Sequence, residues 1–190
     1  MDLMELYDRH HDRIRAFVAS VLRNESDADD VVQETFIRAQ RSLQDLRDPA
    51  RVSPWLLQIA FNLSRDHLRK RKAKGEQDDT ELDSHEDGNG SGSVEKEIER
   101  QQMSGCVQEQ MRLLREDDRA ILTLCDTLDL THAEAAEVLG IEVGAARVRL
   151  HRARKRFREI LEKKCDFSVD ERSVLVCDPK ATPVTPNRVP

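Results

Sequence analysis

Aromatic residues are scarce in this chain, and their scarcity limits what its core can be. Only 4% of the 190 residues are Phe, Trp or Tyr, with one Trp and one Tyr. A core built from this composition must be mainly aliphatic. Glycine and proline are also few, seven and six residues, and helix-forming residues dominate outside two segments. We therefore predict an all-α protein.

Cysteine pairs and long apolar runs are also lacking. The four cysteines are widely spaced and form no CxxC pair: Cys106, Cys125, Cys165 and Cys177. No apolar run approaches the ~20 residues that a membrane-spanning helix needs. The polar start of the chain at residues 1–11 differs from a secretory signal. We expect a cytoplasmic protein without membrane insertion.

Signatures of catalysis are missing as well. The sequence contains no nucleophile motif, no phosphate-binding loop and no cluster of metal ligands, and its six histidines are scattered. We therefore expect a protein that is not an enzyme and that needs no cofactor.

Charge, in contrast, is abundant and unevenly distributed. Charged residues make up 36% of the chain, and the net charge is −6. Ten acidic side chains lie within residues 76–99, whereas basic clusters lie at 65–74 and 147–164. Segregated charge indicates partners better than the total does, so the negative total does not exclude a nucleic-acid partner.

Hydrophobic periodicity and capping residues predict the helices. Ser26 or Asp27 is the expected cap of the second helix, and Ser53 followed by Pro54 is a strong start signal for the third. The segments with helical spacing of apolar residues are 3–22, about 27–43, 53–72, 94–114 and 117–125.

Changes in composition mark the domain boundaries. We predict a first helical domain at 1–74 and a second at 94–164, joined by a flexible acidic linker at 75–93 that is rich in Gly and Ser. The tail at 165–190 alternates partly like a strand and then becomes proline-rich, so we expect it to be partly disordered.

Residues 130–161 predict a helix-turn-helix. Thr131 and Glu134 have the spacing of a capping box, and Gly140 suits the left-handed end of the first helix. The second helix should begin near Val143. Its apolar residues share one face, and arginines occupy the rest of its circumference, as a helix in the DNA major groove requires. The expected buried residues are Ala146, Leu150, Ala153, Phe157 and Ile160.

Four stretches in this order resemble the extracytoplasmic-function (group IV) sigma factors of the sigma-70 family. They are LYDRHHDRIRAFV, DADDVVQETFIRAQRSL, SPWLLQIAFNLSRDHLRKRK and LTHAEAAEVLGIEVGAARVRLHRARKRF, and they cover residues 3–161 apart from the linker. The resemblance implies a non-catalytic subunit that binds core RNA polymerase and directs initiation at specific promoters. A stand-alone helix-turn-helix regulator that binds DNA as a dimer is the alternative, but it leaves the second and third stretches unexplained.

The resemblance also implies functional residues in the first domain. Asp30, Gln33 and Glu34 match the family positions that contact a coiled coil of the polymerase's largest subunit. Asn62 matches a position that contacts bases of the melted −10 element. The basic residues expected to contact phosphates there are Arg65, Arg69, Lys70 and Arg71.

In the second domain the resemblance implies recognition of the −35 element. Arg147 and Arg149 lie early in the recognition helix and are the expected base contacts, because Arg pairs bidentately with guanine. We expect Arg152, Arg154 and Arg156 to contact phosphates. The family often has a small polar residue at the position of Val148, which in this chain either contacts a thymine methyl group or faces the core.

Two segments keep open interpretations. The acidic linker either mimics nucleic acid in a polymerase channel or is a simple tether. Cys165 and Cys177 are either a redox or shared metal pair or two ordinary thiols, since two cysteines alone cannot complete a zinc site. The family also implies an anti-sigma factor as partner and a monomer in its absence.

Overall fold

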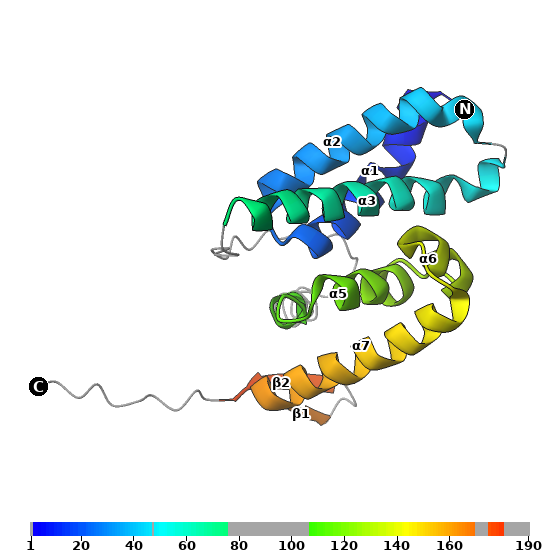
Figure 1. The fold of residues 1–190 in the computed structure, drawn as a ribbon. Helices are drawn as coiled ribbons and strands as arrows, with labels where there is room; N and C mark the ends of the chain where they lie inside the picture. Colours follow the sequence, from blue (N-terminus) through cyan, green and yellow to red (C-terminus); the bar gives the residue numbers. More distant parts are fainter. Residues whose placement is uncertain (1, 47, 76–106, 170–174, 181–190) are drawn as a thin grey trace, which may run out of the picture. The chain divides into compact units, whose positions relative to one another are not determined.

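The computed structural model describes residues 2–46, 48–75, 107–169 and 175–180 (Figure 1). The described parts are helical except for one short hairpin, which confirms the predicted all-α class. The predicted acidic linker lies almost entirely outside the described residues, as do the start of the predicted helix at 94–114 and the last ten residues of the tail.

Three helices near the N-terminus pack around a common core. They are α1 (Leu3–Leu22), α2 (Glu25–Ser42) and α3 (Val52–Ala73), each of which contacts the other two (Figure 1). Phe17 and Phe61 are almost fully buried, and their ring centroids lie 6.3 Å apart. Most other large buried side chains there are aliphatic, as the composition predicts, and include Leu6, Ile14, Leu22, Leu56 and Leu57.

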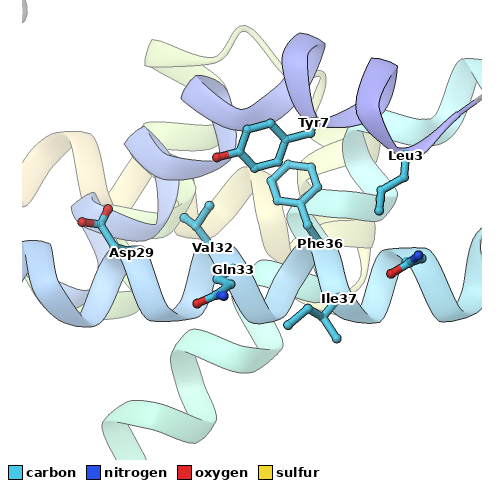
Figure 2. Close-up of a pocket in the computed structure, with 8 residues that line it drawn as sticks. Leu3, Tyr7, Asp29, Val32, Gln33, Phe36 and Ile37 are labelled. Atoms are coloured by element: carbon cyan, nitrogen blue, oxygen red, sulfur yellow. The ribbon is translucent and has the colours of Figure 1, made fainter.

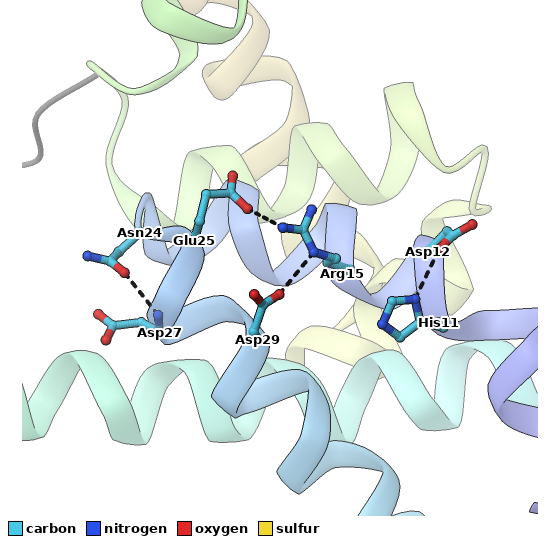
Figure 3. Close-up of polar contacts among 7 residues, drawn as sticks. All are labelled: His11, Asp12, Arg15, Asn24, Glu25, Asp27 and Asp29. Atoms are coloured by element: carbon cyan, nitrogen blue, oxygen red, sulfur yellow. Dashed lines mark hydrogen bonds and ion pairs between the residues drawn. The ribbon is translucent and has the colours of Figure 1, made fainter. Parts of the chain in front are cut away.

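The turn between α1 and α2 is shorter than the sequence suggests. Arg23 has a left-handed backbone, with φ of 61°, and Asn24 is the N-cap of α2. The Asn24 side chain accepts a hydrogen bond of 2.9 Å from the backbone N–H of Asp27 (Figure 3). The prediction that Ser26 or Asp27 caps this helix is therefore wrong, because Asn24 satisfies that free N–H group first.

Helix α3 also begins earlier than predicted. A short 3-10 turn, η2 (Pro49–Arg51), precedes it, and the Asp48 carboxylate accepts a hydrogen bond of 2.9 Å from the backbone N–H of Ala50. The 3-10 turn continues directly into α3 at Val52. Ser53 is consequently the second residue of the helix, and its predicted role as N-cap is wrong.

The helix-turn-helix is present as predicted. Helix α6 (His132–Leu139) starts with the capping box of Thr131 and Glu134, and Gly140 ends it with φ of 64°. The backbone N–H of Ile141 donates to the Ala136 carbonyl over 3.0 Å, which closes the turn before α7 (Val143–Lys164). Two further elements precede α6, namely α5 (Glu116–Leu122) and a π-helical turn, η3 (Thr123–Thr127).

Helix α7 buries a narrower stripe than its sequence suggests. Ala146, Leu150 and Ala153 are buried, at successive helical turns. Phe157 and Ile160, which the periodicity also placed in the core, are only partly buried.

A hairpin follows α7 directly. Strands β1 (Cys165–Val169) and β2 (Leu175–Pro179) are antiparallel (Figure 1). The register pairs Cys165 with Pro179 and Phe167 with Cys177. The two cysteines are therefore not directly opposite each other. The ordered strands show that part of the tail is structured, in agreement with the strand-like alternation.

Candidate functional site

One face of α2 presents polar side chains to solvent. Asp30, Gln33 and Glu34 follow the spacing of neighbours on a helix surface. Asp30 and Gln33 are exposed, and Glu34 is partly exposed. Glu34 accepts a hydrogen bond of 2.8 Å from Nε of Arg38, one turn further along. The opposite face of α2 is buried against α1 and α3, which fixes the direction in which these three side chains point.

A groove of about 410 Å³ lies beside this face, between α1 and α2 (Figure 2). Tyr7 and Phe36 form its floor, with ring centroids 4.9 Å apart. Gln33 belongs both to the groove and to the polar face. The remaining residues that line it are Leu3, Asp29, Val32, Ile37 and Gln40. Sequence periodicity did not reveal this groove, because it depends on how two helices cross.

An ion-pair network links α1 to the start of α2. Arg15 of α1 is 2.6 Å from Glu25 and 3.0 Å from Asp29, both near the start of α2 (Figure 3). The Arg15 side chain is 29% exposed, so water screens these pairs only in part. The network positions the first turns of α2, which lead into the polar face.

The C-terminal half of α3 carries the predicted −10 residues. Asn62, Arg65, Arg69 and Lys70 are all exposed. The guanidinium of Arg65 lies over the Phe61 ring, 5.6 Å from its centroid, and Arg69 is paired with Asp66 one turn earlier. These side chains extend from one helix and make its C-terminal half predominantly basic, with the Asp66 carboxylate among them.

Arg71 has a different environment from the other predicted −10 residues. Its side chain is only 16% exposed, and its Nη1 lies 3.2 Å from a carboxylate oxygen of Asp27. The Nε2 atom of His67 is 3.1 Å from the same oxygen. Asp27 thus joins the end of α3 to the start of α2, a link that sequence analysis missed because the residues are about forty positions apart.

The arginines expected to contact the −35 element fall into two groups according to their neighbours. Arg147, Arg152 and Arg156 are exposed, and so is Arg154 of the second group. Arg149 is 30% exposed and lies 3.7 Å from Asp117 of α5. Arg154 donates from Nε over 3.1 Å to Asp126 of η3, and this hydrogen bond raises the pKa of Arg154 above its already high ordinary value. The second group therefore has acidic partners within the protein.

Metal ligands do not gather in the part of the chain that the structure describes. Among those residues, no group of three or more His, Cys, Asp or Glu side chains is arranged to hold a metal ion. Cys165 is buried, with 2% of its surface exposed. None of the described helices is both long and apolar enough to span a membrane.

Comparison with protein families matches both helical parts of the chain. The model described as Sigma-70 region 2 matches residues 6–74, which contain most of α1 and all of α2 and α3. The model described as Sigma-70, region 4 matches residues 104–157, which contain the helix-turn-helix. The hairpin lies outside both matches.

Curated relatives cover most of the chain. RNA polymerase sigma factor CarQ of Myxococcus xanthus is 31% identical over 83% of this chain and 87% of its own length. ECF RNA polymerase sigma factor SigE of Mycolicibacterium smegmatis is 32% identical over 84% of this chain. The aligned region spans 61% of that relative.

Solved structures share the fold. The sigma factor RpoE of Bartonella quintana, in complex with the anti-sigma factor NepR, superimposes with a TM-score of 0.67 over 84% of this chain and 96% of its own, at 23% identity. CnrH, in complex with the cytosolic domain of CnrY, gives a TM-score of 0.59 at 28% identity over 85% of this chain and 88% of its own. Together with the curated relatives, these matches show that the chain belongs to the ECF-type sigma-70 family, the non-catalytic sigma factors that bind RNA polymerase and promoter DNA to initiate transcription.

Proposed function

We propose that three surfaces of this sigma factor divide the work of initiation. The polar face of α2 binds core RNA polymerase, the basic half of α3 holds the melted −10 element, and α7 binds the −35 duplex. The exposed Asp30 and Gln33 beside the apolar groove are the observation that most supports this division. A DNA-binding regulator without a polymerase partner has no use for that surface.

The chemistry of the α2 face suits a basic helix as its partner. The carboxylates of Asp30 and Glu34 accept charge-assisted hydrogen bonds, which are stronger than neutral ones. Gln33 supplies both a donor and acceptors between them. The adjoining groove offers Tyr7 and Ile37 to an apolar side chain of the same partner. Arg38 must give up its bond to Glu34, or share it, when the partner binds.

Opening of the −10 element requires no chemical energy from this protein. A surface that binds single-stranded DNA better than duplex shifts the population toward the melted form. Each extruded base costs about a few kcal/mol, which contacts to the strand must repay. In this proposal the exposed Asn62 contacts a base, and Arg65, Arg69 and Lys70 neutralise phosphates. Because Arg71 is bound to Asp27, we assign it to holding α3 against α2 as well as to the basic surface.

Recognition of the −35 element falls to α7. Its exposed arginines suit contacts to the DNA backbone and to base edges, and Arg147 is the best placed for a base because it lies near the helix N-terminus. Asp117 and Asp126 pair with Arg149 and Arg154, respectively. This pairing favours contacts of these two arginines at the edge of the DNA major groove rather than with its bases.

Regulation by a protein inhibitor is suggested by the structural relatives. The structural relatives RpoE and CnrH are found with the anti-sigma factor NepR and with CnrY. We infer that an anti-sigma factor holds this protein inactive in the cytoplasm, and that the protein is a monomer when it has no partner.

A binding assay tests the polymerase surface. The triple variant Asp30→Ala, Gln33→Ala and Glu34→Ala should lose binding to core polymerase, measured by fluorescence anisotropy of the labelled full-length chain. The control is Asp8→Ala with Asp12→Ala, which removes two carboxylates from exposed positions of α1. It should bind normally. Normal binding by a folded triple variant contradicts the assignment of α2.

A further inference from the structure

The outward face of α7 is not the face that carries most of its arginines. An α-helix has 3.6 residues per turn. The side of α7 opposite the buried Ala146, Leu150 and Ala153 is therefore occupied by residues other than the arginines. The exposed residues closest to that direction in the first three turns are Gly144, Val148 and His151. Arg147 and Arg152 flank this strip on its two sides, and Arg149 lies near the buried stripe.

Val148 is an apolar side chain in the middle of this strip. It is 49% exposed, so the interpretation that it faces the core is wrong. A β-branched residue is also not favoured in a helix for local reasons. In the DNA major groove, thymine presents the only apolar group on a base edge, its C5 methyl group. A valine at the centre of a DNA-facing strip matches that group.

Gly144 precedes Val148 by one turn and has no structural reason to be glycine. It is helical, its φ is not positive, and a Cβ atom added there would meet no protein atom within 4 Å. Glycine inside a helix lowers stability relative to alanine. The remaining reason for glycine at this position is a close approach of the backbone to a ligand. The first turn of α7 is where a recognition helix comes nearest to the bases.

The charges around the strip fit a DNA duplex as its occupant. Arg147 and Arg152 are exposed on either side of the strip, so positive charge flanks it, as suits a partner with anionic phosphates and with acceptor atoms on its base edges. The acidic partners of α7, Asp117 and Asp126, contact Arg149 and Arg154 outside the strip. The strip is therefore apolar at its centre and cationic at its margins.

We propose that Val148 contacts the C5 methyl group of one thymine in the −35 element, and that Gly144 permits the backbone approach which this contact needs. The proposal rests on the function proposed above, and it makes Val148 a determinant of promoter specificity. The preference that it adds is for thymine over cytosine or uracil at one base pair.

Uracil substitution isolates the methyl group. Promoter duplexes with each −35 thymine replaced singly by uracil are transcribed by core polymerase with the full-length protein. At one position the wild-type protein should lose activity by about four-fold, the change expected for one buried methyl group. Val148→Ala should abolish that difference between thymine and uracil. Val143→Ala, which shortens another exposed valine of α7 (38% exposed), should preserve it.

The outcomes separate this inference from the function on which it rests. Lack of specific initiation on every promoter would overturn both. Normal initiation without a uracil effect at any −35 position, or an unchanged uracil effect in Val148→Ala, would overturn the inference alone. Gly144→Ala gives a second measure: its melting temperature should equal or exceed that of the wild type while its activity on −35-dependent promoters falls. Unchanged activity would contradict the role of Gly144.

Discussion

Replacing Thr131 with Ala removes both halves of the cap that starts α6. The Thr131 hydroxyl accepts from the backbone N–H of Glu134 over 3.3 Å, and the Glu134 carboxylate accepts from the backbone N–H of Thr131 over 2.8 Å. The hydroxyl also donates to that carboxylate over 2.7 Å. The substitution breaks the first and third of these bonds and frees Glu134 from the position in which it forms the second.

The expected cost follows from the exposure of the site. Loss of a Thr cap destabilises a helix by about 0.5–2 kcal/mol. Because Thr131 is exposed, water replaces part of each lost bond, so we expect about 1 kcal/mol. In a chain of this size that lowers the melting temperature by about 2–4 °C. Thr131→Ser keeps a hydroxyl and should lie close to the wild type.

The cap also predicts how stability depends on pH. The hydrogen bonds from Thr131 hold the pKa of Glu134 below its ordinary value of 4.5. The folded state therefore binds the proton of Glu134 less readily than the unfolded state does. The contribution of Glu134 is complete above pH 4.5 and is lost as the pH falls through its lowered folded-state pKa. The deficit of Glu134→Gln relative to the wild type should thus shrink in acid.

Urea unfolding followed by circular dichroism, at pH 7 and at a series of values below 5, measures both effects. A Thr131→Ala variant as stable as the wild type at pH 7 contradicts the capping role. A Glu134→Gln deficit that grows as the pH falls contradicts the assignment of the lowered pKa.

Other predictions concern the core, the turn and the DNA contact. Phe61→Ala should cost about 3–5 kcal/mol in urea unfolding, since Phe61 is 2% exposed and packs against Phe17; a loss below 1 kcal/mol contradicts its place in the core. Gly140→Ala should cost about 1–2 kcal/mol because Gly140 has a left-handed backbone, and Gly140→Asn should cost less; equal losses refute the backbone argument. Arg147→Ala should cost about 1–3 kcal/mol in binding at one −35 position; a uniform loss across sequences makes Arg147 a phosphate contact.

Local signals in the sequence predicted the helix-turn-helix well. The capping box at Thr131, the left-handed Gly140 and the start of α7 at Val143 all depend on residues within a few positions of each other. The periodicity of Ala146, Leu150 and Ala153 likewise identified the buried face of α7 without tertiary information.

The sequence did not predict which of several nearby residues cap a helix, nor the contacts between distant residues. Asn24 and Asp48 cap their elements ahead of the predicted residues, since several capping side chains compete within a few positions. The bond between Arg71 and Asp27, and the groove floored by Tyr7, exist only after α1, α2 and α3 have packed. Local sequence patterns do not predict contacts between residues that are far apart in the chain.

The arginines of α7 likewise show what cannot be predicted from the sequence within the functional site. Composition marks all of them as cations, but only the fold shows which have acidic neighbours within the protein. Arg149 has Asp117 beside it, whereas Arg147 extends from the exposed side of the helix. Conversely, the sequence left two interpretations of Val148 open, and its exposure of 49% excludes the one in which it faces the core.

Reconstituted transcription tests the central claim most directly. Purified core polymerase is combined with the full-length protein and fragments of its own genome, and the start sites are mapped. We expect initiation at discrete sites, each preceded by two separated sequence elements, with none when the protein is omitted or carries the Asp30, Gln33 and Glu34 substitutions. Absence of specific initiation on every fragment, with polymerase that is active with another sigma factor, would contradict the account.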